Sequence, residues 1–161
     1  RASSAGVHVK LNVRSVCLLV PGVPGMSENI EVVSVVGRYL EHARIVYFRN
    51  GGNEELFLSS ADWMPRNLDK RIELLFPVLD APVRKRIAGI IEAYFKDERK
   101  ARRLEADGTW MRRKKAKAGA FSAQDSFHEA ALKRRKSDDR APTGELVIRR
   151  LPRQGGAEEN T

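Results

Sequence analysis

Two residues suited to phosphate chemistry stand two positions apart near the middle of the chain. On an extended segment, His42 and Arg44 point to the same side, about 7 Å apart along the strand. An arginine fork binds phosphate oxygens bidentately, and a histidine can give, take or carry a group near neutral pH. A histidine beside a strand is more often structural, however, so the pair alone leaves both interpretations open.

A second polar run follows, and alternation predicts a strand over residues 68–76. Ser60 and Asp62 end the strand before it, and Arg14 ends the first strand of the chain. We expect these neighbouring strand ends to gather His42, arginines and short acceptors around one anion. The alternative is a solvated strand edge with internal salt bridges. The predicted strand face carries four polar residues: Asn67, Asp69, Arg71 and Glu73.

The elements that must position these residues follow from hydrophobic periodicity. Period-two patterns predict five strands, and Pro21–Gly25 can only form a loop. Asp80 predicts the start of a helix with Pro82 in its first turn, and further helix is expected near 37–41 and 124–136. The expected architecture is a layered α/β domain. The strands are expected over 7–13, 30–36, 43–48, 55–60 and 68–76, and the buried stripe of the helix is Val83, Ile87, Ile90, Ile91 and Tyr94.

Charge is distributed unevenly over the 161 residues, whose net charge is +9. Residues 1–95 carry a net +2 and residues 96–161 a net +7, which suggests a polyanionic partner. We expect the residues after Lys96 to be a loosely attached basic extension, with disorder over 137–161. A single cysteine, Cys17, excludes an internal disulfide and fits a reducing compartment. No run is apolar and long enough to span a membrane.

The motifs around His42 resemble a known superfamily. His42-x-Arg44 followed by residues 59–73 is similar to the second motif of the phospholipase D superfamily, with Arg44 in place of lysine and Asp62 in place of asparagine. Over roughly residues 5–115 the chain more specifically resembles the carboxy-terminal part of the bacterial polyphosphate kinases that use ATP. From residue 116 onward it resembles nothing we can name. The segments that carry this resemblance are 13–17, 21–30, 36–42, 59–69 and 96–103.

The resemblance implies an α/β fold with a phospholipase-D-like mixed sheet flanked by helices, and two domains, 5–115 and the basic, partly helical or disordered 116–161. It implies reversible transfer of the terminal phosphoryl of ATP to polyphosphate through a phosphohistidine. That histidine and the magnesium-associated arginines belong to a preceding domain, so no metal ligand is expected here. His42 matches a catalytic position, at which it stabilises or protonates the leaving oxygen. The expected binders of ATP phosphates are Arg14, His42 and Arg71, and the expected supporting residues are Arg44, Asp62, Arg66 and Glu73.

Two other functions stay open from the sequence. One is a phosphodiesterase of the phospholipase D type, which shares the fold but which the missing motif lysine disfavours. The other is a module without activity that binds polyphosphate or nucleic acid through its basic extension. The chain begins at Arg1 rather than Met, so we expect a fragment, and the resemblance implies that the amino-terminal half of the enzyme is missing from it. The other expectations are ATP or ADP and polyphosphate as partners, no specific nucleic acid, a homo-oligomer, and a location in the cytoplasm or peripherally at the inner membrane.

Overall fold

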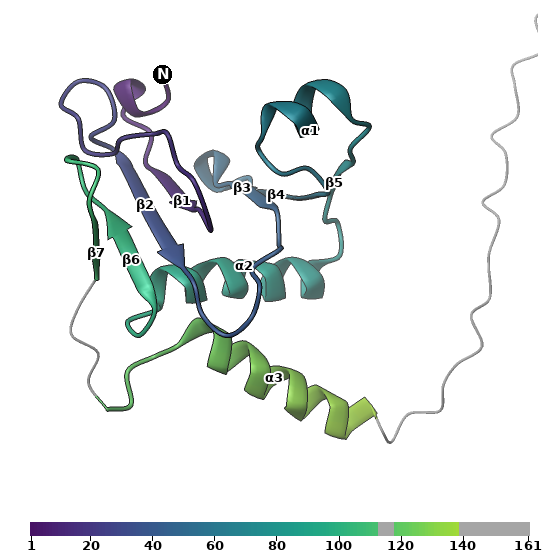
Figure 1. Cartoon of the computed structure of the whole chain (residues 1–161). Helices are drawn as coiled ribbons and strands as arrows, with labels where there is room; N and C mark the ends of the chain where they lie inside the picture. Colours follow the sequence, from purple (N-terminus) through teal and green to yellow (C-terminus); the bar gives the residue numbers. More distant parts are fainter. Residues whose placement is uncertain (113–117, 139–161) are drawn as a thin grey trace, which may run out of the picture.

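The computed structural model describes residues 1–112 and 118–138, which form two β-sheets and three α-helices (Figure 1). Two short 3-10 helices, Ser3–Ala5 and Asn50–Gly52, accompany them. The fold is thus mixed α/β, as predicted. In chain order the elements are β1 (Val9–Asn12), β2 (Ile30–Val35), β3 (Ile45–Phe48), β4 (Glu55–Ser59), α1 (Pro65–Lys70), β5 (Leu75–Pro77), α2 (Ala81–Lys96), β6 (Ala101–Leu104), β7 (Trp110–Arg112) and α3 (Ala123–Asp138).

The larger sheet has the strand order β1-β2-β6-β7. β1 and β2 are parallel and are joined by the loop that contains Pro21–Gly25, whereas β6 pairs antiparallel with β2 and with β7. β2 lies between two strands and is the most apolar of them, with Val32, Val33 and Val35 fully buried. Val32 and Val33 point to opposite faces of the sheet and are both fully buried, so this part of β2 is covered on both sides.

The smaller sheet has the order β3-β4-β5, with both pairs antiparallel. The prediction of one strand over 68–76 is wrong. Residues 65–70 form α1, and only Leu75–Pro77 pair with β4. Pro65 takes the first turn of α1, where its fixed φ suits a helix and its missing N–H costs no hydrogen bond. The strand ends near His42 therefore belong to two sheets instead of one.

Helix α2 joins the two sheets and forms the centre of the core. Asp80 caps its start by accepting a hydrogen bond from the Val83 amide at 2.9 Å, as predicted. Ile87 and Tyr94 of the predicted stripe are buried, whereas Val83 is 44 % exposed. In Figure 1, α2 extends along the lower side of both sheets. Its buried residues Ala93 and Tyr94 pack with Val35 of β2, Ala101 of β6 and Ala123 of α3.

The residues after Lys96 are not loosely attached where the structure describes them. β6 and β7 complete the larger sheet, and α3, which contains the predicted helix 124–136, packs against α2. Asp97 is fully buried and fixes this arrangement. Its Oδ1 accepts hydrogen bonds from the amides of Arg99, Lys100 and Ala101, and its Oδ2 accepts one from Ala123 at 2.8 Å. One carboxylate thus ties together the end of α2, the start of β6 and the start of α3.

Two other expectations have different outcomes. The helix predicted near 37–41 is wrong, because that segment is an irregular loop held by side chains of α2 and α3. The domain boundary between 115 and 116 falls in 113–117, outside the described residues, and stays a prediction. The disorder expected over 137–161 also falls almost entirely outside them. Among the residues that are described, no helix is long and apolar enough to cross a membrane.

Candidate phosphate-binding site

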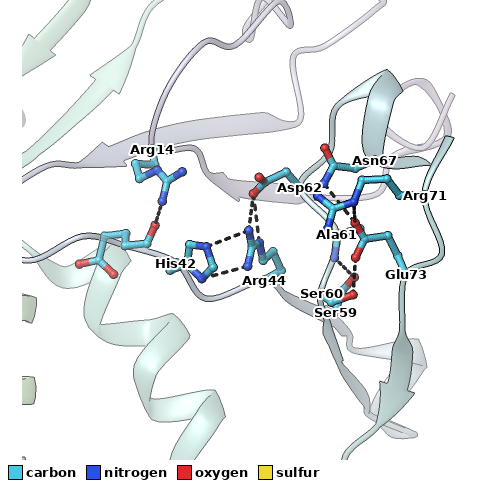
Figure 2. A network of polar contacts seen from close by, with 11 residues as sticks. Arg14, His42, Arg44, Ser59, Ser60, Ala61, Asp62, Asn67, Arg71 and Glu73 are labelled. Atoms are coloured by element: carbon cyan, nitrogen blue, oxygen red, sulfur yellow. Dashed lines mark hydrogen bonds and ion pairs between the residues drawn. The ribbon is translucent and has the colours of Figure 1, made fainter. Parts of the chain in front are cut away.

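His42 lies against the guanidinium group of Arg44 in the segment that leads into β3. The ring atoms Nδ1 and Nε2 are 3.0 and 3.1 Å from Nη1 and Nη2 of Arg44 (Figure 2). The two side chains are therefore much closer than regular strand spacing predicts. A guanidinium only donates hydrogen bonds and an imidazole offers at most one acceptor nitrogen, so at most one of these two contacts is a hydrogen bond, and the tautomer decides which.

Arg44 is held in place from its other side by Asp62, which follows β4. The Asp62 Oδ1 atom accepts hydrogen bonds from Nε and Nη2 of Arg44 at 3.0 and 2.8 Å. These hydrogen bonds are the main cause that holds the pKa of the Asp62 carboxyl below its ordinary value, and the nearby positive charge of Arg14 adds to the effect. Asp62 thus stays ionised at neutral pH and balances the charge of Arg44.

Arg14 approaches from the segment that follows β1. Its Nη1 donates a hydrogen bond to the backbone carbonyl of Glu41, the residue that precedes His42. In Figure 2, His42 lies between the side chains of Arg14 and Arg44. The structure therefore brings together Arg14, His42, Arg44 and Asp62, which the sequence placed on three separate segments.

A second polar cluster surrounds Glu73, between α1 and β5. The Glu73 carboxylate accepts a hydrogen bond from the Ser60 hydroxyl and another from the side-chain Nδ2 of Asn67 at 3.1 Å. It also forms an ion pair with Arg71 at 3.4 Å. The Ser60 hydrogen bond is the main reason why the pKa of Glu73 is below its ordinary value, with smaller contributions from Asn67, Arg71 and Arg44. Figure 2 shows this cluster beyond Asp62, on the side away from Arg14.

The shared strand face that the sequence predicted over 67–73 does not exist, because α1 occupies most of it. Asn67 is buried on α1, where its Oδ1 has no hydrogen-bond partner within the described part of the chain. Asp69 and Arg66 are exposed on the same helix, and within the described residues no hydrogen bond or ion pair joins Arg66 to the site. Glu73 contacts Arg71 rather than His42, so the residue that it orients here is an arginine.

Sequence reasoning missed the residues that fix the loop before His42. The Glu41 carboxylate accepts hydrogen bonds from the hydroxyl of Tyr94 on α2 and from Nε2 of Gln124 on α3, the latter at 2.6 Å. Burial is the main cause that raises the pKa of Tyr94 well above its ordinary value, and the Glu41 carboxylate adds to it. Gln124 stands 83 positions from Glu41. No local pattern points to this contact, because Gln124 is one of many polar residues in α3.

Comparison with known proteins identifies the family. The family model described as polyphosphate kinase C-terminal domain 2 matches residues 1–124. The polyphosphate kinase of Rhodopirellula baltica is 54 % identical over 142 residues, which cover 88 % of this chain and 17 % of that protein. The polyphosphate kinase of Pseudomonas aeruginosa is 53 % identical over 112 residues, or 70 % of this chain and 16 % of that one.

The fold is similar to a solved structure as well. The crystal structure of the polyphosphate kinase from Porphyromonas gingivalis superposes with a TM-score of 0.77 and 42 % identity, over 84 % of this chain and 21 % of that one. The chain thus spans about a fifth or less of the length of these relatives. Because the family model covers most of the sequence, the chain belongs to the polyphosphate kinase family, and residues 1–124 match the carboxy-terminal domain 2 of that family.

Proposed function

We propose that this domain supplies one half of a phosphoryl-transfer site that moves the terminal phosphoryl of ATP reversibly onto polyphosphate. The observation that carries the proposal is the position of His42 between Arg14 and Arg44. The relatives are polyphosphate kinases several times longer than this chain. The phosphohistidine that the family resemblance implies therefore belongs to another domain, which faces this one across the nucleotide.

The chemistry requires compensation of negative charge at the transferred phosphoryl and at the leaving oxygen. Arg14 and Arg71 are the proposed donors: among the described residues Arg14 is bound to a neutral carbonyl, and Arg71, in the second cluster, pairs with Glu73 but has a side chain that is 60 % exposed. Arg44 is held by two hydrogen bonds to Asp62 and its side chain is only 19 % exposed. Its proposed role is to position the ring of His42.

His42 is the proposed donor to the leaving oxygen. In the structure its ring faces the Arg44 guanidinium, to which at most one ring nitrogen can be an acceptor. A phosphate oxygen that arrives beside the ring is an acceptor for an imidazole N–H. We therefore expect substrate binding to turn His42 from a partner of Arg44 into a hydrogen-bond donor towards phosphate.

Magnesium is implied by the resemblance, which assigns the residues associated with it to the preceding domain. Within residues 1–112 and 118–138, no three His, Cys, Asp or Glu side chains gather as a metal site. The carboxylate of Asp62 is bound to Arg44, and that of Glu73 is bound to Arg71, Ser60 and Asn67. No step of the proposal depends on a metal held by this chain. A homo-oligomer and a cytoplasmic location stay predictions.

Calorimetric titration with ADP and ATP tests the binding half of the proposal. Arg14→Ala and Arg71→Ala are each expected to weaken nucleotide binding about tenfold or more, since hydrogen bonds between charged groups are lost. Lys85→Ala, on the exposed side of α2, is the matched control that removes one positive charge elsewhere. An unchanged affinity for Arg14→Ala or Arg71→Ala would remove that residue from the site.

The catalytic role of His42 needs the rest of an enzyme. In a chimaera in which this chain replaces the matching segment of the Rhodopirellula baltica kinase, His42→Ala is expected to abolish polyphosphate synthesis without lowering the melting temperature. Near-normal synthesis would show that His42 is not catalytic and has a structural role instead. The 161-residue chain alone is expected to make no polyphosphate and to hydrolyse no phosphodiester, and diester hydrolysis would favour the phosphodiesterase alternative.

A further inference from the structure

A row of polar and basic side chains crosses one face of the larger sheet. Ser34 on β2 stands opposite Arg102 on β6, and Arg102 stands opposite Arg112 on β7. Residues directly opposite one another on neighbouring strands point to the same face. Lys100 precedes Arg102 by two positions and shares this face by the alternation of a strand.

The helices cover the other face of the same sheet. Val35 and Ala101, the neighbours of Ser34 and Arg102 in the sequence, are buried in the core that α2 and α3 form. Since consecutive strand residues alternate between faces, the row of Ser34, Arg102 and Arg112 lies on the side away from those helices. The basic residues are thus presented outward by the packing of the core.

This face contains a hollow of about 420 Å³. None of the described residues that line it is a carboxylate. Arg99 at its rim is paired with Asp125 at 2.7 Å, but for Lys100, Arg102 and Arg112 the described part of the chain shows no ion pair. Within residues 1–112 and 118–138, these three positive charges have no carboxylate partner. The residues that define this basic hollow are Arg14, Ser34, Lys100, Arg102, Trp110 and Arg112.

The basic hollow adjoins the candidate site through Arg14. Arg14 lines the hollow, and its Nη1 also donates to the carbonyl of Glu41 beside His42. Arg14 is thus shared by the candidate site and the hollow. Guanidinium, ammonium and hydroxyl donors suit phosphate oxygens. Trp110 is the one aromatic residue among the described residues that line the hollow, whereas proteins that bind single-stranded nucleic acid stack successive bases on several aromatic side chains.

We propose that the basic hollow binds a run of phosphates of the polyphosphate chain, beyond the phosphates that react at His42. The inference rests on the proposed function, because that function supplies a polyphosphate near Arg14. Each successive phosphate brings another negative charge, which Arg102, Arg112 and Lys100 compensate in turn. The hollow thus serves to hold the growing chain rather than to perform the transfer.

Trp110 allows a direct test in the chain as it exists. In a Trp63→Phe background Trp110 is the only tryptophan, and Trp63 is 76 % exposed, so this substitution is not expected to disturb the fold. Polyphosphate of about a hundred phosphates, with at least one negative charge per unit, is expected to change Trp110 fluorescence. A long polyphosphate that binds without altering Trp110 fluorescence would contradict the proposal.

Removal of two positive charges tests whether polyphosphate binds at the basic hollow or is attracted by positive charge anywhere on the surface. The double variant Arg102→Ala/Arg112→Ala is expected to bind long polyphosphate about tenfold or more weakly, and to lower the slope of log affinity against log salt by about two. Lys85→Ala/Arg86→Ala removes the same charge from the exposed side of α2 and is expected to change neither. Equal losses in both double variants, or no loss in either, would overturn the proposal. Circular dichroism confirms folding, and Arg102→Lys/Arg112→Lys is expected to restore most of the affinity.

Two further arms separate this inference from the proposed function. ATP binding is expected to be weakened by Arg71→Ala but not by Arg102→Ala/Arg112→Ala. If Arg71→Ala and His42→Ala leave ATP binding intact while the double variant loses polyphosphate binding, the proposed function fails and the hollow stands. If Arg71→Ala weakens ATP binding but Arg102→Ala/Arg112→Ala leaves polyphosphate binding unchanged, the proposal for the basic hollow is wrong. Tighter binding of a single-stranded oligonucleotide than of polyphosphate at equal charge would assign the hollow to nucleic acid instead and overturn the proposal.

Discussion

The carboxamide of Gln124 on α3 donates a hydrogen bond to the carboxylate of Glu41 at 2.6 Å, one residue before His42. The same carboxamide donates to the Tyr39 carbonyl at 2.8 Å and accepts from the Tyr39 amide at 3.1 Å. The Gln124 carboxamide thus bonds both the N–H and the C=O of Tyr39, as a residue of a neighbouring β-strand would. Because Gln124 is buried, these hydrogen bonds are shielded from water and hold the loop before His42 against α3.

Gln124→Ala is therefore expected to destabilise the protein by about 1–3 kcal/mol, because it leaves buried polar partners without hydrogen bonds. It is also expected to weaken ATP binding, since the segment that carries His42 loses its support. Urea unfolding and calorimetry measure the two effects. Glu129→Ala, at an exposed position of the same helix, is the control. Full stability with unchanged ATP binding would show that the loop is held by other contacts.

Gly37→Ala tests the same contact from the opposite side. A methyl group at Gly37 would collide with the carboxamide of Gln124, which cannot turn away without losing its hydrogen bonds to Tyr39 and Glu41. The substitution is expected to be clearly destabilising in the natural chain and much less so in the Gln124→Ala background. A double-mutant cycle of urea unfolding measures this coupling. Additive effects would mean that the loop accommodates the methyl group elsewhere.

The elements that the sequence predicted well are those whose signal is local. The helix from Ala81 could be predicted because Asp80, Pro82 and a 3.6-residue stripe agree. The strand predicted over 68–76 shows how a local signal misleads. Ile72 and Leu74 alternate with polar residues as a half-buried strand does, yet they are 99 and 66 % exposed. Alternation identifies a strand only where its apolar face finds a core.

The contacts of the site could be predicted only in part, for a related reason. Residue types and spacing were sufficient to select His42, Arg44 and Asp62, since each lies beside a recognisable strand. The role of Asp97 was predictable only in part, because its contacts with the amides of residues 99–101 are local, whereas the Ala123 amide is 26 residues away on α3. The role of Gln124 was not predictable. Its partners are 83 and 85 residues away, so no spacing rule reaches them.

Asp97→Ala is expected to destabilise the protein more than any exposed substitution, by about 3 kcal/mol or more, because four backbone amides lose a buried charged acceptor. Asp97→Asn keeps one carbonyl acceptor and is expected to lie between the two. Thermal and urea unfolding measure the order of the three proteins. Asp125→Ala, which removes an exposed carboxylate paired with Arg99, serves as the control. Equal stability of Asp97→Ala and this control would contradict the structural role of Asp97.

Asp62→Asn is expected to change how stability depends on acid. Hydrogen bonds from Arg44 lower the pKa of Asp62 below its ordinary value of 3.8, so the folded state binds its proton less readily than the unfolded chain does. The stabilisation is therefore complete above about pH 4 and is lost as the pH falls through the lowered pKa. Urea unfolding between pH 2 and pH 7 is expected to show a smaller acid-induced loss for Asp62→Asn than for the natural chain. Parallel curves of stability against pH would mean that the contact with Arg44 contributes nothing to stability in solution. Asp69→Asn, at an exposed position of α1, is the control.

Tyr94→Phe is expected to act at the opposite end of the pH range. Burial and the Glu41 carboxylate raise the pKa of Tyr94 above its ordinary value of 10, so the folded protein keeps a proton that the unfolded chain releases. That stabilisation is fully present below about pH 10 and is lost as the pH rises towards the raised pKa. The natural chain is therefore expected to lose stability steeply above pH 10, and Tyr94→Phe less steeply.

At neutral pH the variant is expected to be less stable by about 1 kcal/mol, since Glu41 loses one donor. Tyrosinate absorbance and urea unfolding measure the two effects together. A phenol at position 94 that ionises at its ordinary pKa would show that the hydroxyl faces water, and with it the clamp of α2 on the loop before His42 would be absent.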